Sequence, residues 1–159
     1  MKERTWSLLI LVGLLVIAGG VLLFKKVTVL HIENMDHPRT VRIRVSPTEP
    51  FSVFCIHSIY KEPVVEEFQA DGDAVVLKGV RTKSPAVMQY YGFEDMKGFH
   101  PMNQRLGAIY FKWGIGEGQG LIVGDRKIYL SGIGERGDRI QLRVESMPLL
   151  NYLLSEMFK

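Results

Sequence analysis

The chain has 159 residues, a formal net charge of +3 at pH 7 and a hydrophobic fraction of 47%. This length supports one domain with its own core and leaves little room for a second. The basic residues are scattered along the chain, so the sequence predicts no nucleic-acid partner. The single cysteine, Cys55, excludes an internal disulfide and a four-cysteine zinc site.

The first segment of the chain is apolar enough to predict a transmembrane helix. No residue from Thr5 to Phe24 is charged, and a helix of about 20 apolar residues crosses a bilayer core. Trp6 occupies a position typical of an interfacial aromatic residue. We expect residues 1–26 to be the uncleaved anchor of a single-pass cell-membrane protein, with residues 27–159 outside the cytoplasm. A cleaved signal peptide is the alternative, although its apolar centre normally spans only about 7–15 residues.

Four small residues in the apolar run indicate where a second helix would approach. Small side chains let the backbones of two transmembrane helices come close together. The residues in question are Gly13, Ala18, Gly19 and Gly20. The sequence therefore predicts that the anchor packs against a transmembrane helix of another protein.

After residue 26 the chain changes to the alternation of apolar and polar residues that is typical of β-strands. Val41, Ile43 and Val45, for example, share one face of a strand. Strands are expected at 27–32, 40–45, 51–57, 64–70, 74–80, 105–113, 120–123, 127–131 and 139–145. Short strands separated by turns predict an all-β fold, a sandwich or small barrel of about eight or nine strands.

Two short helices are expected among or after these strands. Ser84 and Pro85 are typical of a helix start, and Gly92 is typical of the residue that follows a helix. The following segment, 93–104, is expected to be an irregular loop. Residues 148–158 have helical spacing, and this helix either covers the sheet or offers its apolar face to a membrane surface or partner helix.

The connection at 58–63 carries an unusual group of polar residues. His57 shares a strand face with Cys55, and a hairpin places it opposite Val65 or Glu66. A contact between His57 and a carboxylate is therefore expected. The candidate cluster consists of His57, Ser58, Glu62 and Glu66. It is either a recognition site or a hydrogen-bonded pair that closes the hairpin.

Catalysis and metal binding are less favoured for this cluster. Adjacent strand residues point to opposite faces, so Ser58 is poorly placed to pass a proton to His57. Cys55 and His57 could face one metal ion, but the other histidines lack ligand spacing. A strand rather than a helix is expected after the glycine-rich segment 114–120, unlike in a phosphate-binding loop. We therefore expect no enzymatic activity, no cofactor and no bound metal.

The same connection resembles a known family. A strand that ends in His-Ser, a short charged connection with proline and a Val-Val-Glu-Glu-Phe segment are similar to the bacterial family called domain of unknown function 1850. The matching residues are His57, Ser58, Pro63, Val64, Glu66 and Phe68. The segment "DGDAVVLKGVRTKS" that follows also fits the next hairpin of the family.

The resemblance implies a small anchored or exported β-domain with no established enzymatic activity. Members of the family are commonly encoded beside TAXI-class TRAP transporters (tripartite ATP-independent periplasmic transporters), which take up carboxylates. The resemblance thus implies a non-enzymatic accessory or modulatory subunit that contacts the polytopic membrane subunit or the solute-binding protein of such a transporter. The alternative is a free-standing, membrane-anchored envelope domain that binds a small ligand or metal.

Overall fold

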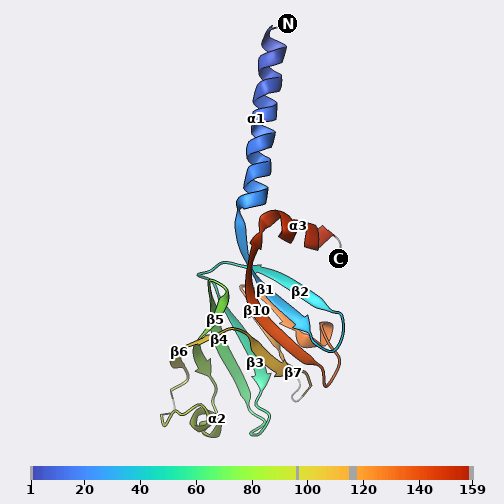
Figure 1. Cartoon of the computed structure of the whole chain (residues 1–159). Coiled ribbons are helices and arrows are strands. Elements are labelled where there is room, and N and C mark those ends of the chain that lie inside the picture. The colour runs from blue at the N-terminus through green and yellow to red at the C-terminus, as the bar shows by residue number, and fades with distance from the viewer. Residues whose placement is uncertain (1, 96, 115–117, 158–159) are drawn as a thin grey trace. The chain divides into compact units, whose positions relative to one another are not determined.

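The computed structural model describes the chain except residues 1, 96, 115–117 and 158–159. In the described residues, ten strands form two antiparallel sheets, with short helices between and after them (Figure 1). The prediction of a mostly β fold is confirmed, with one or two more strands than expected. The chain divides into two compact units, Thr28–Glu145 and the combination of Met1–Val27 with Ser146–Lys159.

The first sheet has four strands in the order β2-β1-β10-β7. Its strands are β1 (Lys26–Asn34), β2 (Thr40–Val45), β7 (Ile109–Lys112) and β10 (Arg139–Pro148). Leu30 of β1 lies opposite Ile43 of β2, and Leu142 of β10 lies opposite Ile109 of β7. The period-two pattern of the sequence therefore places apolar side chains together on one face of this sheet.

The second sheet has six strands in the order β6-β5-β4-β3-β8-β9. Its strands are β3 (Pro50–Ile56), β4 (Pro63–Asp71), β5 (Ala74–Arg81), β6 (His100–Leu106), β8 (Gly120–Val123) and β9 (Arg126–Tyr129). The predicted turn between β4 and β5 contains Gly72 at a φ of 61°, a conformation that glycine adopts without steric cost.

The apolar faces of the two sheets pack against each other and form one core. Phe51 of β3 and Phe68 of β4 stack at a ring distance of 5.5 Å, and each is 1% exposed. Leu30 and Leu142 of the other sheet belong to the same buried cluster. Burying a side chain of this size stabilises the fold by about 1.5–3 kcal/mol, so the two sheets hold each other in place.

One predicted strand is two strands that belong to different sheets. The sequence predicts a single strand at 105–113, but β6 ends at Leu106 and β7 begins at Ile109. β6 pairs with β5 in the six-stranded sheet, whereas β7 pairs with β10 in the four-stranded sheet. Most of β6 was expected to be a loop, because this edge strand lacks the alternation that reveals a half-buried strand.

The helix α2 (Pro85–Tyr90) is present where the sequence predicts it. Ser84 occupies the N-cap position, although its side chain makes no capping hydrogen bond. Val87 and Met88 are buried, so α2 is fixed by apolar packing rather than by its cap. A single turn of 3₁₀-helix, η1 (Leu130–Gly132), follows β9.

The terminal unit contains α1 (Lys2–Phe24) and α3 (Leu149–Met157). The backbone N–H of Leu149 donates a hydrogen bond to the carbonyl of Lys25 at 2.7 Å, and the two helices contact each other. The predicted C-terminal helix is therefore present, and no described residue of it is buried.

The structure does not support the expected transmembrane helix. In α1, the structure describes the side chains of all residues except 2–5 and 8. Within the described part of the chain, no helix is both long and apolar enough to cross a membrane. α1 nevertheless continues without a break through the uncharged run that the sequence indicates.

Candidate functional site

The β3–β4 connection folds around the imidazole ring of His57, which is only 9% exposed. The Nδ1 atom of His57 accepts hydrogen bonds from the backbone N–H groups of Ile59 and Tyr60, each at 3.3 Å. The backbone of His57 also bonds to the carbonyl of Glu62 and to the N–H of Lys61, both at 2.8 Å. Because Nδ1 is an acceptor, the neutral ring carries its proton on Nε2. His57 therefore holds this turn together.

Glu66 places a carboxyl group on the core face of β4, opposite Val53 of β3. The carboxylate accepts a hydrogen bond from the hydroxyl group of Tyr91 at 2.8 Å. Burial raises the pKa of Glu66, and the hydrogen bond from Tyr91 offsets part of that effect. Burial and the neighbouring Glu66 carboxylate also raise the pKa of Tyr91. The pair is thus a neutral phenol that donates to a carboxyl group whose ionisation is disfavoured.

Two tyrosines at the end of α2 connect His57 with Glu66. The ring of Tyr90 packs edge-on against His57 at 4.7 Å and against Tyr91 at 5.6 Å. The ring of Tyr60 stacks on His57 at 5.2 Å. These contacts and the bond from Tyr91 to Glu66 form one continuous group. We call these residues, His57, Tyr60, Glu66, Tyr90 and Tyr91, the His57 cluster.

The structure brings some of the predicted site residues together, but the expected pairing of His57 with Val65 or Glu66 was wrong. β3 and β4 stop pairing at Ile56 and Pro63, so the backbone of His57 bonds to Glu62. Glu62 immediately precedes β4 and lies four positions before Glu66, a distance of about 13 Å in an extended chain. Glu66 therefore joins the cluster through Tyr91, and the side chains of Ser58 and Glu62 are exposed.

Sequence reasoning missed Tyr90 and Tyr91. The available signal was the predicted short helix, which ends in two adjacent aromatic residues before Gly92. Nothing in the local pattern shows that this helix end lies against the β3–β4 connection, because the contact is between distant parts of the chain. The packing of Val87 and Met88 determines that placement.

Cys55 lies on the same strand face as His57 and contributes little reactivity. Burial raises the pKa of its thiol to about 11, and the negative charge of Glu66 acts in the same direction. Because the thiolate is the reactive form, this cysteine is a poor nucleophile and a poor metal ligand near neutral pH. Among the described residues, no group of three or more His, Cys, Asp or Glu side chains is placed to hold a metal ion.

A groove of about 540 Å³ lies where β4 begins and β5 ends. Its lining includes Glu62, Pro63, Val65, Arg81, Thr82 and Lys83. The hydroxyl group of Thr82 donates a hydrogen bond to the carbonyl of Pro63 at 2.7 Å, which ties the two strands together beside the groove. The groove therefore combines apolar and charged side chains on a fixed backbone.

A second polar group surrounds the turn between β1 and β2. Asn34 is 4% exposed, and its Nδ2 donates to Asp138 at 2.7 Å. Its Oδ1 accepts bonds from the backbone N–H groups of Asp36 at 2.9 Å and His37 at 3.1 Å. The side-chain hydrogen bond from Arg139 lowers the pKa of Asp36 to about 2. These bonds connect the β1–β2 turn to the segment before β10.

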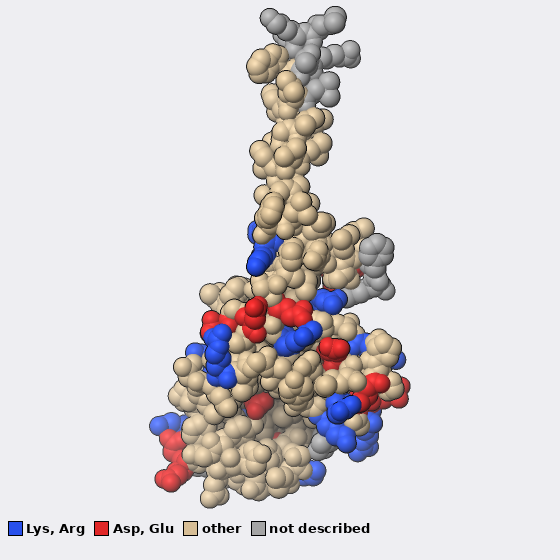
Figure 2. Space-filling view, in the orientation of Figure 1, with Lys and Arg blue, Asp and Glu red and all other residues tan. Residues whose placement is uncertain are grey.

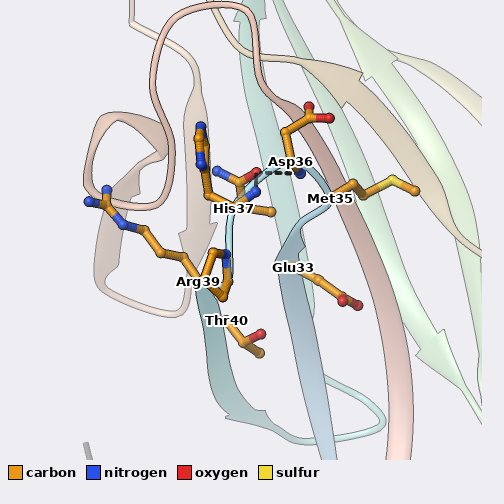
Figure 3. Close-up of a pocket in the computed structure, with 8 residues that line it drawn as sticks. Glu33, Met35, Asp36, His37, Arg39 and Thr40 are labelled. Carbon is orange, nitrogen blue, oxygen red and sulfur yellow. Dashed lines mark hydrogen bonds between the residues drawn. The ribbon is translucent and has the colours of Figure 1, made fainter.

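The concave surface of this turn has a volume of about 320 Å³. Figure 3 shows the side chains of Met35, Asp36, His37 and Arg39 pointing in different directions from the turn. A binding site requires polar groups that converge on one position. We therefore assign this polar group a structural role.

Comparisons with known proteins assign no family: no family model matches the chain, and no curated protein or solved structure is significantly similar to it.

Replacing Glu66 with glutamine should change how stability depends on pH. Because burial raises the pKa of Glu66, the folded protein keeps this proton at pH values where the unfolded chain has lost it. The resulting stabilisation is complete below the ordinary pKa of 4.5 and is lost as the pH rises through the raised value. Glu66→Gln stays neutral and retains an acceptor for Tyr91, so this loss should disappear.

Thermal melts from about pH 4 to pH 8 measure the effect. Glu62→Gln changes an exposed carboxyl group of the same hairpin and serves as the control. We expect the control to keep the wild-type pH dependence. Identical pH profiles for Glu66→Gln and the wild type would contradict the assignment of a raised pKa to Glu66.

Proposed function

We propose that this protein is a membrane-anchored, non-enzymatic subunit that binds a partner protein through the surface around the His57 cluster. The observation that carries this proposal is the exposure of three large side chains there. Ile59 is 65% exposed, Tyr60 is 42% exposed and Tyr90 is 60% exposed. We call these three residues the aromatic tip. Exposed apolar and aromatic groups that lie close together are typical of interaction surfaces, and tyrosine is enriched among residues that dominate binding energy.

The charge distribution agrees with a binding surface at this end of the β-domain. Figure 1 shows α2 and the β3–β4 connection at the same end, and Figure 2 shows this end as mostly uncharged in the face that it presents. Elsewhere on that face, acidic and basic side chains lie interspersed. Interface centres are depleted in charged residues in the same way.

The His57 cluster also makes the aromatic tip rigid before any partner binds. Tyr60 and Tyr90 both pack on the ring of His57, and the ring is held by two backbone N–H groups. A surface that is already ordered loses less conformational entropy on binding. His57, Glu66 and Tyr91 therefore support the tip from below, whereas Tyr60 and Tyr90 also form part of its contact surface.

The chemistry of the cluster favours binding over catalysis. The Nδ1 atom of His57 is already used by the backbone, and the raised pKa of Cys55 disfavours its thiolate. A general base needs a free ring nitrogen within hydrogen-bond reach of the proton that it removes. The side chain of the neighbouring Ser58 is exposed, and no described interaction joins it to the imidazole.

The proposed membrane anchor is α1. The sequence from Thr5 to Phe24 lacks charge over 20 residues, and all of it lies within this helix. Large apolar side chains such as Leu15 and Val16 are more than 60% exposed, which water would disfavour and lipid would not. Open space lies beside Gly13, Gly19 and Gly20, as the approach of a second helix requires. In this proposal the β-domain lies outside the cytoplasm.

The sequence resemblance suggests which partner to test. It connects the hairpin of His57 and Glu66 with accessory proteins of TAXI-class TRAP transporters, which take up carboxylate-type solutes. We therefore propose the polytopic membrane subunit of such a transporter as the first partner and its solute-binding protein as the second. The groove favours one alternative, a free-standing anchored envelope domain that binds a small ligand.

The anchor proposal predicts that the protein stays with membranes during alkaline carbonate extraction. We expect an intact mass that includes the whole apolar segment. Leu14→Lys with Val16→Lys should release the protein, because each lysine at the centre of a bilayer costs about 2.5–3.5 kcal/mol. A soluble wild-type protein whose sequence begins near Gly19 would show that the segment is a cleaved signal peptide.

The partner proposal predicts that Ile59→Glu prevents co-purification with the TRAP membrane subunit. Only the backbone N–H of Ile59 bonds to His57, so the substitution should preserve the turn while placing a charge on the aromatic tip. We expect recovery of the membrane subunit to fall at least about tenfold, as removal of a central interface residue commonly does. The melting temperature should stay unchanged.

Tyr110→Ser is the matched control, because Tyr110 is 63% exposed but lies on β7 of the other sheet. It should leave co-purification at the wild-type level. Wild-type recovery with Ile59→Glu, or an equal loss with Tyr110→Ser, would overturn the assignment of the aromatic tip as the partner surface.

A further inference from the structure

We propose that the groove between the start of β4 and the end of β5 binds a small organic anion that has an apolar body. The inference deepens the second candidate function, the ligand-binding envelope domain, by naming the chemical class of the ligand. It does not depend on the transporter partner. The groove and the aromatic tip can be tested separately, because they use different residues.

The groove lies on the outer face of the six-stranded sheet. Pro63 and Val65 alternate along β4 with the buried Val64, so they point away from the core. Arg81 of β5 lies directly opposite Val65, which places it on the same outer face. The His57 cluster, in contrast, joins β4 through Glu66 on the core face.

The size and the apolar part of the groove suit a small molecule. Its volume of about 540 Å³ lies within the range of about 300–1,000 Å³ that is usual for ligand pockets. Pro63 and Val65 provide apolar surface for the body of a ligand. The hydroxyl group of Thr82 donates to Pro63 and accepts a bond from the backbone N–H of Ser84 at 3.2 Å. The backbone beside the groove is therefore fixed before a ligand arrives.

Arg81 is a positioned cation in this lining. Its guanidinium group donates to the carboxylate of Glu67 at 2.9 Å and lies over the ring of Phe99 at 5.1 Å. The Phe99 ring in turn covers Gly79, where a Cβ atom would lie only 2.3 Å from it. The absence of a side chain at Gly79 thus lets an aromatic ring lie flat beside Arg81. Two partners hold the guanidinium, and one of them neutralises part of its charge.

Lys83 supplies the charge that remains available to a ligand. It lines the groove, its side chain is exposed, and no described carboxylate lies within salt-bridge distance of it. Among the described residues that line the groove, Glu62 alone carries a carboxylate. Lys83, together with the part of the Arg81 charge that Glu67 does not neutralise, favours an anion beside this apolar surface, while Glu62 opposes it. The proposal therefore predicts that removing the charge of Lys83 weakens anion binding and that removing the charge of Glu62 strengthens it.

The experiment uses the full-length protein in detergent micelles and a fluorinated probe followed by ¹⁹F NMR. The probe is 4-fluorophenylacetate, which joins a carboxylate to an aromatic body. The comparison compounds are 4-fluorobenzyl alcohol, which is neutral, and 4-fluorobenzylamine, which is a cation. All titrations are run at one detergent concentration, so partition into micelles is the same for every protein variant. We expect saturable broadening of the anion signal and none for the amine.

Three substitutions of exposed residues test whether the groove prefers a negatively charged ligand. Removing one nearby charge should change the affinity by about fivefold, which is the upper end of what solvent-exposed ion pairs contribute. Lys83→Gln should therefore weaken binding of the anion by this factor, and Glu62→Gln should strengthen it. Lys127→Gln, on β9 at the opposite edge of the sheet, is the matched control and should leave the affinity unchanged.

Absence of saturable binding, equal binding of the amine, or a loss of affinity with Glu62→Gln would overturn the proposal. A loss with Lys127→Gln equal to that with Lys83→Gln would show a general charge effect and would also overturn it. The partner proposal stands or falls independently, because Lys83→Gln should leave co-purification unchanged and Ile59→Glu should leave anion binding unchanged.

Discussion

The hydrogen bond from the Tyr91 hydroxyl group to the Glu66 carboxyl group determines how one end of the β-domain is built. β4 places this carboxyl group on the core face, where an unsatisfied polar group is costly. Tyr91 can reach it only if α2 lies against the end of the sheets, and the burial of Val87 and Met88 keeps the helix there. The buried carboxyl group of Glu66 thus connects the position of α2 to the placement of a polar residue on the core face of β4.

The same constraint places Tyr90 on the ring of His57 and so supports the aromatic tip. His57 receives two backbone N–H groups, and the turn that it closes contains Lys61 at a φ of 57°. A left-handed conformation costs a residue with a side chain about 1–2 kcal/mol, which the bonds around His57 must offset. The turn is therefore an ordered structure that exposes Ile59 and Tyr60, and this combination supports a binding role.

Much of the β-domain was predictable from the sequence because one face of each central strand is buried. Ile140, Leu142 and Val144 alternate with polar residues, and the structure places β10 there, between β1 and β7. β6 was missed because only Met102 and Leu106 mark its core face in the sequence, and the polar Gln104 between them interrupts the alternation. Local patterns thus predict a strand where one face is regularly apolar and miss a strand where a polar residue breaks the pattern.

The candidate site was predictable only in part. The sequence identified His57 and Glu66 as unusual. Which residue lies opposite His57, however, depends on where the β3–β4 register ends, and it ends at Ile56 and Pro63. A shift of a few residues at the end of a hairpin changes every cross-strand neighbour. The role of Tyr91 depends on the packing of a separate helix, which local sequence does not encode.

A double-mutant cycle on Glu66 and Tyr91 tests the account most directly. Glu66→Met leaves the Tyr91 hydroxyl group without its acceptor, and Tyr91→Phe leaves the buried carboxyl group without its donor. Urea unfolding of the full chain in detergent should show that each single change destabilises the fold. The double change should recover part of the loss, with a coupling energy of about 1 kcal/mol. Strictly additive losses would show that the two groups do not interact and would contradict the account.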